Sequence, residues 1–133
     1  MPRGSRLRYV GLALATIVVG LSVHRNDSML TSAVRDKLGD VLWAAMITWL
    51  ISALAPNAAL RVRIIAALAV CFVVEGTQLY HTQALDSARR TMAGHLVLGS
   101  GFDVLDLLAY TFGVLMTGLL EFTVRHARAR TVP

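Results

Sequence analysis

The chain has 133 residues, of which 56% are hydrophobic and only 16% are charged, and its mean hydropathy is +0.61. Soluble domains carry about 25% charged residues, so this chain has too few charges to cover a water-soluble globule. The formal net charge of +5 does not indicate a nucleic acid partner, because the basic residues lie at the ends of apolar runs and form no basic face interleaved with aromatics. One integral membrane domain, spanning residues 1–133, is the class that this composition favours.

The cysteine and histidine content gives no sign of a metal site or a disulfide framework. Cys71 is the only cysteine, and the four histidines are scattered along the chain. A disulfide framework or a paired-cysteine metal site needs more cysteines than this. We therefore expect no metal ion and no cofactor.

The first apolar run, Tyr9–Val23, follows the arginines Arg3, Arg6 and Arg8. This order is also that of a secretion signal, but a cleaved signal ends in small residues of the Ala-x-Ala type. The segment Leu21-Ser22-Val23 is a poor cleavage site by that standard. Because more apolar runs follow, we expect an uncleaved first span.

Three further apolar runs follow the first. The second is Val41–Ala55, the third continues from Arg63 to Tyr80 with Glu75 as its only internal charge, and the fourth is Leu107–Leu120. A membrane span needs about 20 residues, and each run reaches this length when its flanking amphipathic residues are included. The predicted spans are residues 7–24, 40–56, 62–81 and 103–124.

These runs predict the fold class. Helices of a soluble bundle show a polar face at a period of about 3.6 residues, and the first, second and fourth runs have none. We therefore predict an all-α membrane protein built as a bundle of four transmembrane helices. With only four helices, a homo-oligomer or a larger membrane partner is compatible with the sequence, which specifies neither.

The basic residues predict the orientation. Eight lie at the ends and connections on one side of the predicted bundle and five on the other. Because cytoplasmic loops carry the excess of Lys and Arg, the first side is cytoplasmic. The N and C termini are both on this side, where we also expect Glu121 to be a solvated residue among C-terminal arginines.

Small residues predict where the helices approach one another. The fourth run contains Ala109 and Gly113 four residues apart, with Gly118 beyond them, and the first run contains Thr16 and Gly20 at the same spacing. Small residues at this spacing let membrane helices pack closely. In an alanine-rich chain such pairs also arise by chance.

Glu75 is the residue most indicative of function. A charged side chain well inside a span costs about 2.5–3.5 kcal/mol on insertion scales and marks a candidate site. Gln78 follows by three residues and shares its helix face, and Asp103 and Asp106 repeat this spacing before Tyr110. A purely structural reading is that Glu75 joins helices through Gln78.

An estimate of depth below the outer membrane surface places these residues in one layer. With a rise of about 1.5 Å per residue, Glu75 and Tyr110 both lie less than about 10 Å below the outer surface. Asp40, expected to head the second helix, starts at that surface. The candidate ligand-binding residues of this layer are Glu75, Gln78, Asp103, Asp106, Tyr110 and Asp40.

Two alternatives apply to parts of this layer. Asp40 and one of Asp103 and Asp106 are as well explained as helix caps, because carboxylates bind the free amides of a helix start. In the connection from His81 to Phe102, Arg89, Arg90 and His95 are candidates to cover the layer. A histidine at such a position is more often an interfacial residue than a ligand.

Three segments resemble a bacterial membrane-protein family known as domain of unknown function 2809. They are Leu38–Leu50 (LGDVLWAAMITWL), Cys71–His81 (CFVVEGTQLYH) and Gly94–Gly118 (GHLVLGSGFDVLDLLAYTFGVLMTG). The likeness covers nearly the whole chain. It implies a multi-pass protein of the bacterial inner (plasma) membrane.

The C-terminal half is also distantly similar to VanZ-like proteins, which are linked to glycopeptide-antibiotic tolerance and the cell envelope. The similar positions are Glu75, Gln78, Asp103, Asp106 and Gly113. Two positions depart from that pattern: Ser100-Gly101 stands where those proteins have an arginine, and Tyr110 where they have an asparagine. The similarity implies a shared site more than a shared substrate.

Three functions are compatible with the sequence. The first is an envelope protein whose outward-facing polar site binds a lipid, a glycolipid or another polar head group. The second is a membrane hydrolase or transferase that uses paired carboxylates for acid–base chemistry, with His95 assisting. The third is a proton or ion path, for which the inner half offers no expected acid. Whether the protein is an enzyme is left open.

Overall fold

The computed structural model describes residues 3–25, 31–94, 99 and 101–130, and within them the chain is helical with no strand. The helices are α1 (Arg3–Arg25), α2 (Ser32–Leu54), α3 (Leu60–Thr77), α4 (Gln83–Arg89) and α6 (Val104–Arg130). The all-α prediction is therefore confirmed for the part of the chain that the structure describes.

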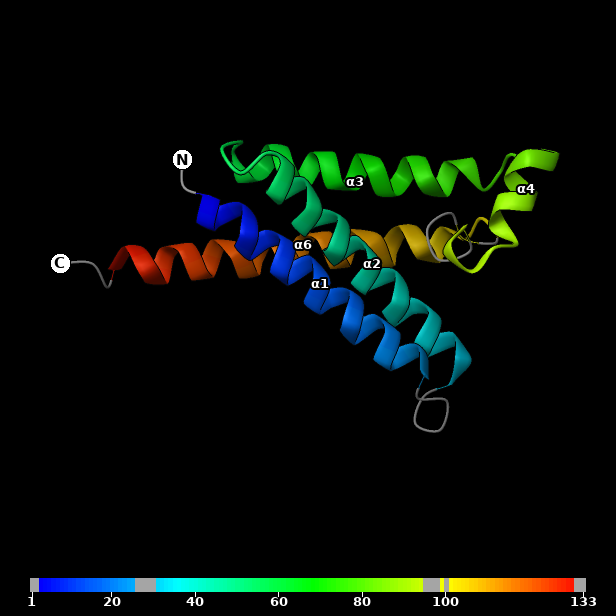
Figure 1. Cartoon of the computed structure of the whole chain (residues 1–133), viewed down its shortest axis with the longest axis horizontal. Coiled ribbons are helices and arrows are strands. Elements are labelled where there is room, and N and C mark those ends of the chain that lie inside the picture. The colour runs from blue at the N-terminus through cyan, green and yellow to red at the C-terminus, as the bar shows by residue number, and fades with distance from the viewer. Residues whose placement is uncertain (1–2, 26–30, 95–98, 100, 131–133) are drawn as a thin grey trace.

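The arrangement centres on α2. This helix contacts α1, α3 and α6, and α3 also contacts α6. Figure 1 shows α3 and α6 running in opposite directions, with α1 and α2 crossing them at an angle. The start of α1, the end of α6 and the α2–α3 connection lie at one end of the bundle, and the end of α1, the start of α2 and α4 lie at the opposite end. We call these the termini end and the loop end.

Three helices are long and apolar enough to cross a membrane. They are Ser5–Arg25 in α1, Ser32–Leu54 in α2 and Val104–Ala127 in α6. By length and composition, the described residues therefore contain three candidate membrane spans. The predicted third span corresponds to α3, whose 18 residues include Arg61, Arg63 and Glu75. Because of these charges, composition alone does not identify α3 as a candidate membrane span.

The start of α2 differs from the expected one. The helix begins at Ser32, and the Thr31 hydroxyl caps it by accepting a hydrogen bond of 3.4 Å from the Val34 amide. Asp40 consequently lies inside the helix, so the capping role considered for it does not hold. The hydropathy of the polar segment before residue 40 predicts a loop. In the structure this segment forms the first turns of α2.

The glycines of α6 lie at helix contacts, as their spacing indicates. A Cβ atom added to Gly113 would lie 2.5 Å from the Val41 carbonyl oxygen and 3.1 Å from the Ala44 Cβ in α2. One added to Gly118 would lie 2.6 Å from the Ile64 side chain in α3. Gly113 therefore permits the close approach of α2 and α6 that sets the width of the bundle.

A buried ion-pair network, the Glu121 cluster (Tyr9, Arg63, Glu121, Arg125), holds the termini end. Arg63 donates to both Glu121 oxygens, at 2.8 and 3.2 Å, and the Tyr9 hydroxyl donates to Oε1 at 2.5 Å. Arg125 lies 2.7 Å from the same carboxylate. Glu121 is only 6% exposed, so the expectation of a solvated residue is wrong. The carboxylate joins α1, α3 and α6 because its partners come from all three.

The close contact at Gly113 leads to a first prediction. Changing Gly113 to Ala places a Cβ against a backbone carbonyl that cannot rotate away, so α2 and α6 must separate. We expect a loss of about 1–3 kcal/mol of stability, as for other overpacked interiors, measured by denaturant titration of the purified protein in micelles. Gly11→Ala is the control, because nothing lies within 4 Å of its added Cβ. Equal stability of the two variants would contradict the predicted contact.

Candidate functional site

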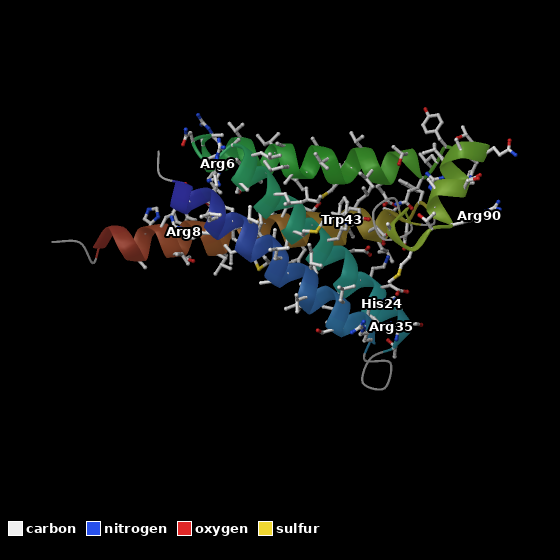
Figure 2. All side chains as sticks on the ribbon, viewed as in Figure 1. Arg6, Arg8, His24, Arg35, Trp43 and Arg90 are labelled. Carbon is white, nitrogen blue, oxygen red and sulfur yellow. The ribbon has the colours of Figure 1, made fainter. Side chains whose placement is uncertain are left out.

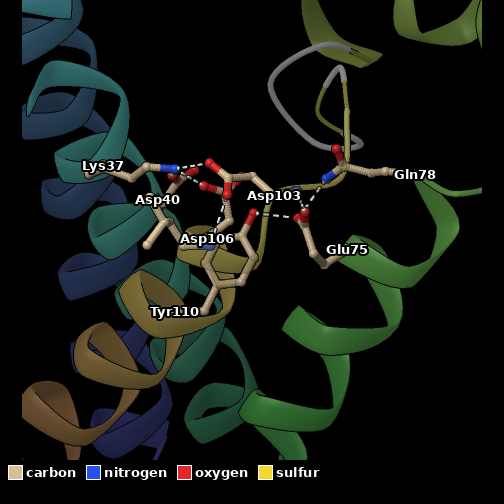
Figure 3. A network of polar contacts seen from close by, with 8 residues as sticks. Lys37, Asp40, Glu75, Gln78, Asp103, Asp106 and Tyr110 are labelled. Atoms are coloured by element: carbon tan, nitrogen blue, oxygen red, sulfur yellow. Dashed lines mark hydrogen bonds and ion pairs between the residues drawn. The ribbon is translucent and has the colours of Figure 1, made fainter. Parts of the chain in front are cut away.

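Polar side chains from three helices meet at the loop end (Figure 3). The structure brings together all six residues predicted for this layer and one further residue, Lys37. We call this group the Glu75 cluster: Lys37 and Asp40 from α2, Glu75 and Gln78 from the end of α3, and Asp103, Asp106 and Tyr110 from the start of α6.

Glu75 is the centre of the cluster and has no exposed surface. Its Oε1 accepts a hydrogen bond of 2.8 Å from the Asp103 backbone amide. Its Oε2 accepts from the Gln78 side-chain amide at 2.7 Å and from the Tyr110 hydroxyl at 3.1 Å. These three donors satisfy the carboxylate inside the protein and tie the end of α3 to the start of α6.

Lys37 is a site residue that sequence reasoning missed. Its ammonium donates to Asp103 Oδ2 at 2.7 Å and also to Asp106 Oδ1. Asp40 Oδ2 lies 4.0 Å away. From the sequence, Lys37 was expected only as a basic residue in a loop. The usable signal was its position three residues before Asp40, which places both on one helix face once α2 is known to start at Ser32.

Asp103 combines a cap with an ion pair. It immediately precedes the candidate span Val104–Ala127, and its Oδ1 accepts a hydrogen bond of 2.9 Å from the Leu105 amide. Asp103 therefore caps the start of the helix, which is the structural role that the sequence suggested for one of Asp103 and Asp106. The hydrogen bond from Lys37, followed by that from Leu105, lowers the pKa of the Asp103 carboxyl from its usual value.

A cavity of about 600 Å³ lies beside the cluster. Its apolar wall includes Ile17 and Leu21 from α1 and Leu42 and Met46 from α2. Polar cluster residues line it as well, namely Lys37, Asp40, Gln78, Asp103, Asp106 and Tyr110. Glu75 is absent from the lining, so its role is to hold Gln78, Asp103 and Tyr110 in place behind the cavity wall.

Gln78 and Trp43, which are among the lining residues, each have a buried polar atom without a hydrogen-bond partner among the described residues: Gln78 Oε1, an acceptor, and Trp43 Nε1, a donor. Gln78 is 4% exposed and is held by Glu75 through its amide nitrogen. The Trp43 ring packs against that of Tyr110 with centroids 5.4 Å apart. The side chains are thus fixed while one polar atom of each is unsatisfied.

The loop arginines do not join the contacts of the cluster. Arg89 is 8% exposed and donates to the carbonyl oxygens of Thr77 at 2.7 Å and Tyr80 at 2.9 Å. It therefore closes the C-terminal end of α3. Arg90 is exposed, and the prediction for His95 falls outside the described residues.

The described fold is helical, with three helices long and apolar enough to cross a membrane and a cluster of polar side chains at the loop end. A family model described as Protein of unknown function (DUF2809) matches residues 29–114, so the chain belongs to this family. The matched segment contains the whole Glu75 cluster, whereas Tyr9 and Glu121 lie outside it. No solved structure matches the chain.

The ion pairs of Lys37 lead to a second prediction. In a Lys37→Met variant, Asp103 and Asp106 lose their shared cation, so the melting temperature in micelles should fall at pH 7. Because the folded-state pKa of Asp103 is lowered, its contribution is present above the unfolded value of about 3.9 and is lost as the pH falls through the folded value. The difference from the unmodified protein should therefore shrink below about pH 4.

Arg90→Met is the matched control, since it removes one exposed cation at the same end of the molecule. It should leave the melting temperature unchanged at both pH values. A Lys37→Met variant as stable as this control at pH 7 would refute the role assigned to Lys37.

Proposed function

We propose that this protein is a multi-pass component of the bacterial cell envelope that binds the head group of a membrane lipid in its cavity. The observation that carries the proposal is the lining of that cavity. Apolar side chains of α1 and α2, both candidate spans, form one part, and the polar side chains of the Glu75 cluster form the other. An amphipathic molecule matches this division, because its tail and head would each meet a like surface.

We further propose that α3 is a fourth span. Two of its charges lie inside the protein with partners: Arg63 pairs with Glu121, and Glu75 accepts three hydrogen bonds. Charged residues within membrane segments face the bundle interior and pair with one another. Arg61 is at the start of the helix, where a long side chain can reach the membrane surface.

The proposed orientation places the termini end in the cytoplasm. Figure 2 shows Arg6 and Arg8 at this end and His24, Arg35 and Arg90 toward the other. The excess of basic residues near the termini supports a cytoplasmic location for it. The cavity and the Glu75 cluster would then face the outer leaflet, where envelope lipids are accessible.

The distant similarity to VanZ-like proteins supports the same assignment. Its similar positions include Glu75, Gln78, Asp103 and Asp106, all of which belong to the Glu75 cluster. In this proposal Gln78, Asp103 and Asp106 contact the head group, and Glu75 positions them. The absent arginine of that pattern is not replaced by Arg89, whose guanidinium binds the end of α3.

A proton path is less well supported. In the proposed orientation Glu121 would be an acid of the inner half, but Arg63, Arg125 and Tyr9 bind its carboxylate. A carboxylate fixed by two arginines is suited to holding helices together. Cys71, in turn, is buried among Ala67, Tyr110 and Val114, so it does not offer an exposed nucleophile.

The orientation gives a third prediction. Cys71 is fully buried, so cysteines introduced at exposed positions should dominate labelling by a membrane-impermeant maleimide. Arg90→Cys should be labelled in intact spheroplasts, and His126→Cys only after the membrane is opened. The reverse pattern would contradict the proposed topology, and labelling of both in intact spheroplasts would show that α6, which lies between the two positions, does not cross the membrane.

Lipid binding in the cavity gives a fourth prediction. Changing Leu42 to Trp fills the apolar part of the cavity, so lipid retained through purification in mild detergent should fall several-fold by native mass spectrometry. Leu50→Trp introduces the same side chain on α2 at a position outside the cavity lining and should retain lipid. Equal retention by two folded variants would remove the cavity as the binding site.

A further inference from the structure

The termini end of the bundle carries most of the positive charge of the chain. The segments that meet there, residues 3–9, 55–63 and 121–130, contain eight arginines and one acid, Glu121. The rest of the chain carries five basic residues and seven acids. The termini end therefore has an excess of seven positive charges, whereas the remainder has an excess of two negative charges.

The Glu121 carboxylate does not neutralise the surface of this end. It is buried, and two arginines share it: Arg63, whose side chain is also buried, and Arg125, whose side chain is half-exposed. One positive charge of this group is therefore left over. The exposed arginines with described side chains come from three helices, namely Arg6, Arg8, Arg61 and Arg125.

Apolar side chains are exposed directly beside these arginines. Leu7, which lies between Arg6 and Arg8, is exposed, and the candidate span Ser5–Arg25 begins at the same place. Val62, which follows Arg61, is exposed as well. Arginines beside exposed apolar residues suit the level of a membrane at which acyl chains meet head groups. A soluble polyanion would leave the apolar side chains uncovered, whereas a phospholipid covers both kinds of side chain.

We propose that the termini end binds anionic phospholipids through its exposed arginines, which we call the arginine surface (Arg6, Arg8, Arg61 and Arg125). The guanidinium groups donate hydrogen bonds to the lipid phosphate, and the neighbouring apolar side chains contact the first part of the acyl chains. A zwitterionic lipid gains less here, because its ammonium group is repelled by the arginines. The arginine surface lies outside the cavity lining, so this binding goes beyond the proposed function.

The test compares two head groups on the same acyl chains. The full-length protein in mild detergent is titrated with phosphatidylglycerol or phosphatidylcholine, and bound lipid is counted by native mass spectrometry. The lipid is supplied in the titration because an exposed surface exchanges lipid for detergent during purification. We expect phosphatidylglycerol to bind about tenfold more tightly at low ionic strength. Added salt should weaken this preference, because it screens exposed charges.

Charge variants locate the contact. Arg6→Gln combined with Arg8→Gln removes two cations of the arginine surface, so the affinity for phosphatidylglycerol should fall at least about threefold. Lysine at both positions keeps the charge and should retain most of the affinity. The matched control is Arg25→Gln combined with Arg90→Gln, which removes the same charge from exposed positions toward the loop end. It should bind phosphatidylglycerol as the unmodified protein does.

Three outcomes would overturn the inference. The first is equal binding of the two lipids by the unmodified protein. The second is an equal loss in the two glutamine variants, which would make net charge responsible and not the arginine surface. The third concerns Leu42→Trp, which fills the cavity and should keep the preference for phosphatidylglycerol. A preference lost in Leu42→Trp and kept in the Arg6 and Arg8 glutamine variant would assign the anionic lipid to the cavity.

Discussion

The structure depends on the burial of one carboxylate. Glu75 has no exposed surface and accepts hydrogen bonds from the Gln78 side chain, the Tyr110 hydroxyl and the Asp103 backbone amide. A buried carboxylate without partners would be strongly destabilising, so these donors are a condition for α3 to carry Glu75 at all. They also fix the side chains that line the cavity. The energetic requirement of one residue in α3 therefore determines the geometry of the site.

A second buried carboxylate has the same effect at the other end of the bundle. Glu121 binds Arg63 from α3 and Tyr9 from α1. The pairing matters most for α1, because among the described helices its backbone packs closely only against α2. Between the two clusters the helices meet through small residues such as Gly113 and Ala44. Polar contacts thus set the ends of the bundle and close packing sets its middle, as expected where a surrounding apolar phase gives little drive for helix association.

The sequence predicted the helical class and most of the residues that meet in the Glu75 cluster, because these depend on local patterns. Glu75 and Gln78 share a helix face by spacing alone, and so do Asp103 and Asp106. Lys37 was missed because hydropathy cannot distinguish a polar first turn of a helix from a loop. Glu121 was misassigned because its partners Tyr9 and Arg63 are distant in the chain. Arg89 was expected at the layer, but the backbone carbonyls of Thr77 and Tyr80 bind it. The order of side chains in a sequence does not show which backbone carbonyls are available as acceptors.

The central claim, that Glu75 organises the site through its hydrogen bonds, is tested most directly by a double-mutant cycle. The stabilities of Glu75→Met, Tyr110→Phe and the double variant are measured in micelles. In the control cycle Tyr80→Phe replaces Tyr110→Phe, because Tyr80 is 69% exposed. We predict a coupling energy of about 1 kcal/mol or more for Glu75 and Tyr110, and none for Glu75 and Tyr80. Additive effects of Glu75→Met and Tyr110→Phe would contradict the account.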